Sequence, residues 1–213
     1  MPLYFHALYT EGISEEARFP RERYRLIAER LEHTPHGLRI REAPAASEAE
    51  ICTAHDPAYV RRFLSGAMGD AEKRRIGLRP WTDLIIPRTK HLIGGAIAAL
   101  DDVMSEGGVA ANMAGGTHHA HYDWGSGYCV FNDIAICARL ANTRYGIKRI
   151  GVIDLDVHQG DGTATILAKD RGTFTLSVHC AQNFPMTKQS SDLDIALPEG
   201  CDDTTYLERV ASG

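Results

Sequence analysis

The feature that most constrains the fold of this sequence is a short apolar segment that turns acidic at its end. Residues 149–156 read RIGVIDLD, and a histidine and a further aspartate follow within five residues, at His158 and Asp161. A nearly continuous apolar run of this length is typical of a strand in a parallel sheet covered on both faces. The segment therefore predicts such a strand, with polar chemistry placed where it ends.

Strand-like and helix-like segments alternate along the chain. We expect strands at residues 2–6, 109–116, 149–156 and 173–179, and helices at 20–33, 56–66, 87–108, 132–146 and 162–170. Asp56 and Pro57 suit the start of the second helix, and Gly94 and Gly95 interrupt the apolar spacing of the third. The alternation predicts one α/β domain, a parallel sheet with helices on both faces, and ligands at the carboxyl ends of its strands.

The composition is that of an ordinary globular domain. The 213 residues are 44% hydrophobic and 24% charged, and the net charge of -5 gives no basic footprint for nucleic acid. We interpret the one basic cluster, at residues 72–75 (EKRR), as a solvated helix end. Five cysteines without a C-x-x-C pair indicate free thiols in a reducing compartment. With no signal peptide and no membrane span visible, we expect a cytoplasmic protein without a membrane partner; the oligomeric state leaves no signature.

The stretch at residues 154–162, DLDVHQGDG, carries a metal-binding pattern. Asp156 and His158 are two residues apart, so on an extended chain their side chains point to the same side. A carboxylate oxygen and an imidazole nitrogen suit zinc, iron or another divalent transition metal. Asp154 lies on the same side, where it could bind a second cation or hold another side chain. The alternatives are a calcium loop, which His158 disfavours, and simple capping of the next helix.

A second polar stretch at residues 115–123, GGTHHAHYD, contains adjacent histidines. His118 and His119 can act as a general base and its electrostatic partner, because imidazole titrates near neutral pH. The alternatives are a surface pair or a buried structural histidine, and His121 fits a structural role best. Asp154 and Asp161 could fix the tautomers of the pair. With a metal, this constellation suits hydrolysis by an activated water.

The blocks around these residues resemble the histone deacetylase superfamily, and most closely its class IV-like bacterial members. The resemblance covers essentially the whole chain, and its most specific blocks are GGTHHAHYDWGSGYCVFNDIA and VIDLDVHQGDGTA. It implies an arginase/deacetylase-like three-layer αβα fold and a zinc-dependent deacylase. By this resemblance Asp156 and His158 are zinc ligands, and His119 is the catalytic acid/base.

The resemblance also implies roles for the remaining candidate residues. His118 is the electrostatic partner of His119, while Asp154 supports His118 and Asp161 supports His119. A structural potassium site is formed by Asp154, Ser177 and main-chain carbonyls, including those of Asp156, His158 and Val178. The walls of a tunnel for the acyl-lysine stem are Gly127, Tyr128 and Phe184.

Two blocks of the family pattern are not found in the sequence. These are an aspartate block that supplies the third metal ligand and a tyrosine after paired glycines. Asp202, Asp203 and Tyr206 belong to the start of another helix and take neither role. We therefore expect a single deacetylase-like domain over residues 1–213 that is C-terminally incomplete, binds zinc weakly and aggregates readily.

The expected function is hydrolysis of the amide of acetyl-lysine or a related acylated amine. The substrate could be an acylated lysine peptide, a protein or a small acylated amine, and the sequence does not choose among them. One alternative is a non-enzymatic binding or oligomerising module. Another is the ureohydrolase branch of the same fold, which uses two manganese ions, although the histidine block does not fit it.

Overall fold

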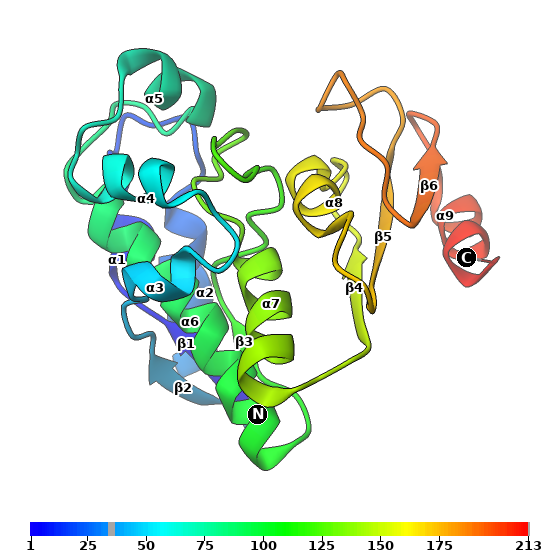
Figure 1. Cartoon of the computed structure of the whole chain (residues 1–213), viewed down its shortest axis with the longest axis horizontal. Coiled ribbons are helices and arrows are strands. Elements are labelled where there is room, and N and C mark those ends of the chain that lie inside the picture. Colours follow the sequence, from blue (N-terminus) through cyan, green and yellow to red (C-terminus); the bar gives the residue numbers. More distant parts are fainter. Residues whose placement is uncertain (34–36, 213) are drawn as a thin grey trace.

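The computed structural model describes residues 1–33 and 37–212, and the described strands form two parallel sheets (Figure 1). The first sheet has the order β2-β1-β3, and the second has the order β4-β5-β6. Every strand pairing within these sheets is parallel, which confirms the predicted α/β class. The strands are β1 (Pro2–Phe5), β2 (Arg39–Glu42), β3 (Ala111–Asn112), β4 (Ile150–Asp154), β5 (Thr173–Cys180) and β6 (Leu193–Leu197).

Helices connect and cover these strands. The longest, α6, packs against β1, β3 and α7, while α8 packs against α7 and β5. Asp56 accepts a hydrogen bond from the backbone of Tyr59 and Pro57 opens the helix, as predicted. No described helix is long and apolar enough to cross a membrane. The helices are α1 (Leu8–Glu11), α2 (Glu22–Glu32), α3 (Glu48–Ile51), α4 (Pro57–Leu64), α5 (Asp70–Ile76), α6 (Ile85–Glu106), α7 (Asp133–Tyr145), α8 (Asp161–Leu167) and α9 (Asp203–Ser212).

The predicted boundaries differ most from the structure at β3. A strand was expected over residues 109–116, but β3 contains only two residues, Ala111 and Asn112. The chain then turns through Gly115 and Gly116, both with positive φ, and Asp133 accepts a hydrogen bond from the Gly116 amide at 3.0 Å. The turn ends the strand early and starts the loop that carries the histidines.

The expectation that the apolar strand is covered on both faces is wrong for β4. Val152 is buried in the main core, but Ile153 is 71% exposed and Leu155 is 51% exposed. Alternate residues of a strand face opposite sides, so one side of β4 packs on the core while the other meets no covering element in the described chain. The outward edges of β3 and β4 also pair with no other strand among the described residues.

Two glycines inside α6 allow close packing against neighbouring segments. A Cβ at Gly94 would lie 2.0 Å from the Pro44 carbonyl oxygen, and one at Gly95 would lie 2.6 Å from the Tyr9 hydroxyl. The absence of a side chain therefore lets α6 approach the segment after β2. This contact explains why glycine interrupts an otherwise regular helical pattern.

We expect the Gly94→Ala substitution to destabilise the protein. Alanine would favour the helix by about 1 kcal/mol, but overpacking against rigid backbone costs about 1–3 kcal/mol or more. Urea unfolding should therefore show a lower free energy for Gly94→Ala. Gly151→Ala is the control, because its Cβ would meet nothing within 4 Å. Equal stability of the two variants would contradict this packing argument.

Candidate functional site

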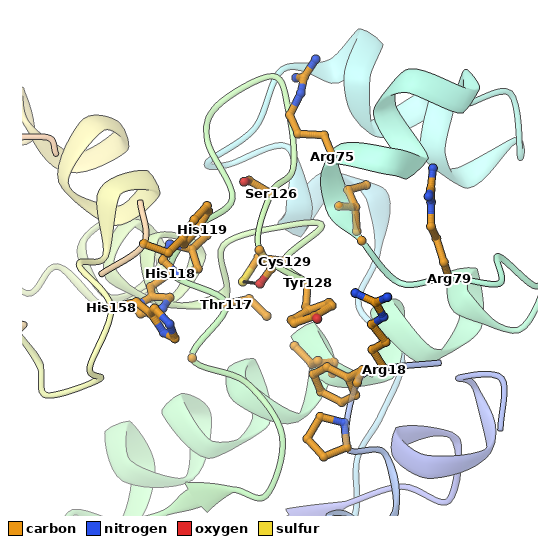
Figure 2. A pocket seen from close by; sticks show the side chains of 18 of the residues that line it. Arg18, Arg75, Arg79, Thr117, His118, His119, Ser126, Tyr128, Cys129 and His158 are labelled. Carbon is orange, nitrogen blue, oxygen red and sulfur yellow. Dashed lines mark hydrogen bonds between the residues drawn. The ribbon is translucent and has the colours of Figure 1, made fainter. Parts of the chain in front are cut away.

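Residues that follow three separate strands converge on one pocket of about 1010 Å³ (Figure 2). The loop after β3 supplies His118 and His119, the segment after β4 supplies Asp156 and His158, and the loop after β5 supplies Phe184. The carboxyl ends of the parallel strands thus meet at the site, as the alternating pattern predicted.

His118 is held by the last residue of β4. Its Nδ1 lies 2.5 Å from Oδ2 of Asp154, and the residue is 5% exposed. Burial opposes protonation, but the hydrogen bond to Asp154 and the charges of Asp154, Asp156 and Asp161 outweigh it, so the pKa of His118 is raised. His118 is therefore the member of the pair that more readily carries a positive charge.

The pKa of His119 is shifted in the opposite direction. Its Nδ1 lies 2.7 Å from Oδ1 of Asp161, but burial and the neighbouring charges of His118 and His158 lower its pKa. Burial raises the pKa of Asp161, whereas hydrogen bonds from His119 and His121 outweigh this and hold it at about 2. An ionised carboxylate only accepts, so Nδ1 of His119 carries the proton and its Nε2 is left as a base.

The structure gives His121 a supporting place behind the pair. Its two ring nitrogens lie 3.1 Å from Oδ2 of Asp161 and 2.9 Å from the Thr165 hydroxyl. The ring also stacks on Trp124, with centroids 3.8 Å apart. His121 is thus a buried, fully engaged histidine that helps to fix the carboxylate on which His119 depends.

Two residues that the sequence analysis did not assign hold the histidine loop in place. Asn132, at the start of α7, donates to the Ala120 carbonyl at 3.2 Å and to the Thr163 hydroxyl at 3.0 Å. Asp133 accepts from the Thr117 amide at 2.8 Å and from its hydroxyl at 2.6 Å. From the sequence, Asn132 and Asp133 indicate only the start of a helix. Their hydrogen bonds to the histidine loop depend on tertiary packing, which the local sequence does not reveal.

The two predicted metal ligands lie beside one another at the pocket. Nδ1 of His158 is 2.9 Å from Oδ1 of Asp156, and Nε2 of His118 is 3.9 Å from the same oxygen. Burial raises the pKa of Asp156, but the backbone hydrogen bond from His158 and the nearby imidazoles lower it overall. This nitrogen and oxygen pair fits part of a zinc site, for which three protein ligands are usual. No set of three such side chains arranged to hold a metal occurs within residues 1–33 and 37–212.

The residues predicted for a potassium site lie on adjacent strands. Asp154 of β4 is in register with Ser177 of β5, and the Asp154 carboxylate accepts from the Asp156 amide at 3.0 Å. The Ser177 hydroxyl lies 3.0 Å from Nδ1 of His179, while the Val178 side chain belongs to a small core beneath α9.

The acidic residues near the end of the chain are remote from this pocket. Asp202 accepts from the Thr205 amide at 2.8 Å at the start of α9, and Tyr206 packs on the small core of Val178, Ile195 and Leu197. The pocket lining includes none of Asp202, Asp203 and Tyr206.

Gly127, Tyr128 and Phe184, which the resemblance assigned to tunnel walls, line the pocket. The Phe184 ring meets that of His119 edge to face, with centroids 4.8 Å apart. A Cβ at Gly127 would lie 2.6 Å from the His119 ring and 3.1 Å from Phe184. Tyr128 has a left-handed backbone (φ 68°) and contacts Phe19 edge to face, with centroids 5.3 Å apart. Phe19 was not predicted, because only the folded chain brings it here.

Several known proteins are similar to this chain in sequence. A model of the histone deacetylase domain matches residues 17–212. An uncharacterized protein of Picosynechococcus sp. is 42% identical over 220 aligned residues, covering 99% of this chain and 70% of the relative. A histone deacetylase-like amidohydrolase of Pseudomonas aeruginosa is 34% identical over 154 residues, covering 70% of this chain and 39% of the relative.

The fold also matches solved structures. The crystal structure of an acetylpolyamine aminohydrolase from Burkholderia pseudomallei superimposes with a TM-score of 0.78 at 22% identity. The match covers 100% of this chain and 76% of the aminohydrolase. It establishes a common three-layer α/β architecture.

We expect Gly127→Ala to lower the free energy of unfolding more than Gly66→Ala does. Both Gly127 and Gly66 have positive φ, so alanine at either position costs about 1 kcal/mol of backbone strain. Only at Gly127 would the methyl group meet the His119 ring, adding about 1–3 kcal/mol. Urea unfolding of both variants measures the difference, and equal losses would contradict the close approach.

Asp161→Asn should lower stability at neutral pH but not in acid. The folded pKa of about 2 lies below the ordinary value of 3.8, so the ionised carboxylate stabilises the fold above pH 4 and this contribution is lost as the pH falls towards 2. The variant should lose about 2 kcal/mol of unfolding free energy at pH 7 and approach the parent near pH 2. Unfolding titrations at several pH values test this, with the exposed Asp123→Asn as a control of equal charge change.

Proposed function

Because this chain belongs to the histone deacetylase family, we propose that it hydrolyses the amide of an acetylated or longer-acylated lysine or related amine. The observation that carries this proposal is the pair of hydrogen bonds from His118 to Asp154 and from His119 to Asp161 at one pocket. The names of the Pseudomonas amidohydrolase and of the Burkholderia acetylpolyamine aminohydrolase support this reaction class.

In this proposal the two histidines divide the proton chemistry. His119, whose pKa is lowered, accepts a proton at Nε2 from the attacking water and then passes it to the leaving amine. His118, whose pKa is raised, remains the positively charged partner and stabilises the negative charge that develops on the amide oxygen. The different surroundings of adjacent histidines thus assign different roles to chemically identical side chains.

The walls of the pocket position the substrate. Gly127 leaves room beside His119, and the rings of Tyr128 and Phe184 present apolar surface to the methylene stem of an acylated lysine. Such a stem buries its carbon chain and brings only the amide to the polar end.

Asp156 and His158 would hold zinc in this proposal, together with a further ligand. Bound zinc would polarise the amide carbonyl and lower the pKa of water. Asp154 and Ser177, paired across β4 and β5, would contribute to a structural potassium site.

Replacing His119 by alanine should lower the rate of deacetylation by about two to four orders of magnitude, because it removes the proposed base. The measurement is hydrolysis of an acetyl-lysine peptide by zinc-loaded protein. His33→Ala is the control, since His33 is exposed and lies outside the pocket. If the parent chain binds the peptide but never cleaves it, the non-enzymatic binding module is the correct alternative.

The pH dependence should report the lowered pKa of His119. The base must be neutral to accept a proton, so activity falls on the acid side as His119 becomes protonated. We expect the acid limb of kcat/KM below pH 6.5, the ordinary histidine value. An acid limb above pH 6.5 would contradict the assignment of His119 as the base.

A further inference from the structure

The pocket is strongly enriched in arginine although the chain as a whole is acidic. The net charge of the sequence is -5, yet only Glu16 and Asp156 supply carboxylates to the pocket lining. The six arginines that line the same pocket are Arg18, Arg23, Arg74, Arg75, Arg79 and Arg88. The local balance of charge is therefore opposite to that of the whole chain.

Five of these arginines are exposed, and one of the five, Arg23, donates a hydrogen bond to the Tyr24 hydroxyl. The other four form a group that we call the arginine rim: Arg18, Arg74, Arg75 and Arg79. In the part of the chain that the structure describes, none of them has a carboxylate within ion-pair distance. The guanidinium carbon of Arg75 lies 5.2 Å from the centre of the Trp124 ring, and the positive charge of Arg75 helps to lower the pKa of Glu72. Elsewhere, by contrast, Arg139 holds Asp170 at 2.8 Å and Arg144 holds Glu50 at 2.8 Å.

The arginine rim lies away from the reacting groups. Figure 2 shows Arg18 and Arg79 across the pocket from the site histidines, with Tyr128 between them. Arg74 and Arg75 come from the last turn of α5, and Arg79 follows that helix. Within the segment at residues 72–75, interpreted from sequence as a solvated helix end, Arg74 and Arg75 are exposed and also border the pocket, whereas Glu72 and Lys73 are half-buried.

We propose that the arginine rim selects acylated lysines whose neighbouring residues are anionic. This inference rests on the proposed function and extends it to the substrate class. A planar guanidinium pairs with carboxylate or phosphate through two parallel hydrogen bonds, and several guanidiniums without a paired carboxylate around one opening favour such groups. The separation from the histidines places the anionic groups on residues beside the acyl-lysine, not on the acyl chain.

The test compares acetyl-lysine peptides that differ only in the flanking residues. Calorimetric titration of the full chain at low salt would use flanks of aspartate, phosphoserine, asparagine and lysine. Two or three exposed ion pairs should make the aspartate peptide bind about tenfold more tightly than the asparagine peptide. The phosphoserine arm distinguishes phosphate from carboxylate as the preferred anion. The advantage should shrink as salt is added, because salt screens exposed charges.

Variants with matched charge changes test whether the arginine rim causes the preference for anionic flanks. The double variant Arg75→Gln/Arg79→Gln should lose most of the preference for anionic flanks. The control Arg149→Gln/Arg171→Gln removes the same charge from exposed arginines outside the pocket lining and should keep it. Equal affinities for all flanks, no binding by any peptide, or the same loss in both double variants would overturn the inference.

Hydrolysis of the same peptides separates this inference from the proposed function. If every peptide is cleaved and bound equally well, the inference fails and the hydrolase proposal stands. If anionic flanks bind more tightly but no peptide is cleaved, the hydrolase proposal fails and the preference of the arginine rim for anions is supported.

Discussion

Two hydrogen bonds between histidines and carboxylates join the two halves of this molecule at its site. His118 and His119 belong to the loop after β3 of the first sheet. Asp154 ends β4 of the second sheet, and Asp161 opens α8, the helix between β4 and β5. The described strands of the two sheets share no backbone pairing. The contacts that set the protonation of the histidines therefore help to hold the two sheets together, alongside the core packing of Val152, Ile166 and Leu167.

Much of the site could be predicted because its residues follow strand ends closely in sequence. Asp154, Asp156 and His158 share one strand end, and parallel strands bring the histidine loop to the same edge. Local spacing carries no information on contacts that only packing creates. This is why the bonds of Asn132 and the place of Phe19 beside Tyr128 were not foreseen.

The fold was predictable to a similar degree and for related reasons. Long helices such as α6 reveal themselves through several turns of apolar spacing, whereas α1, α3 and β2 have only four residues each and give no such signal. The apolar character of β4 indicated a strand but not how many of its faces are covered. Coverage depends on which other segments pack there, and a run of apolar residues is compatible with either outcome.

The arginine rim also affects the rate of association, which is separate from its effect on affinity. An acidic molecule with one positive opening carries a strongly asymmetric electric field, so an anionic partner is repelled by most of the surface and drawn towards the pocket. Attraction of this kind acts before contact and orients the approaching molecule. It raises the association rate constant. The dissociation rate constant is set instead by the short-range contacts inside the pocket.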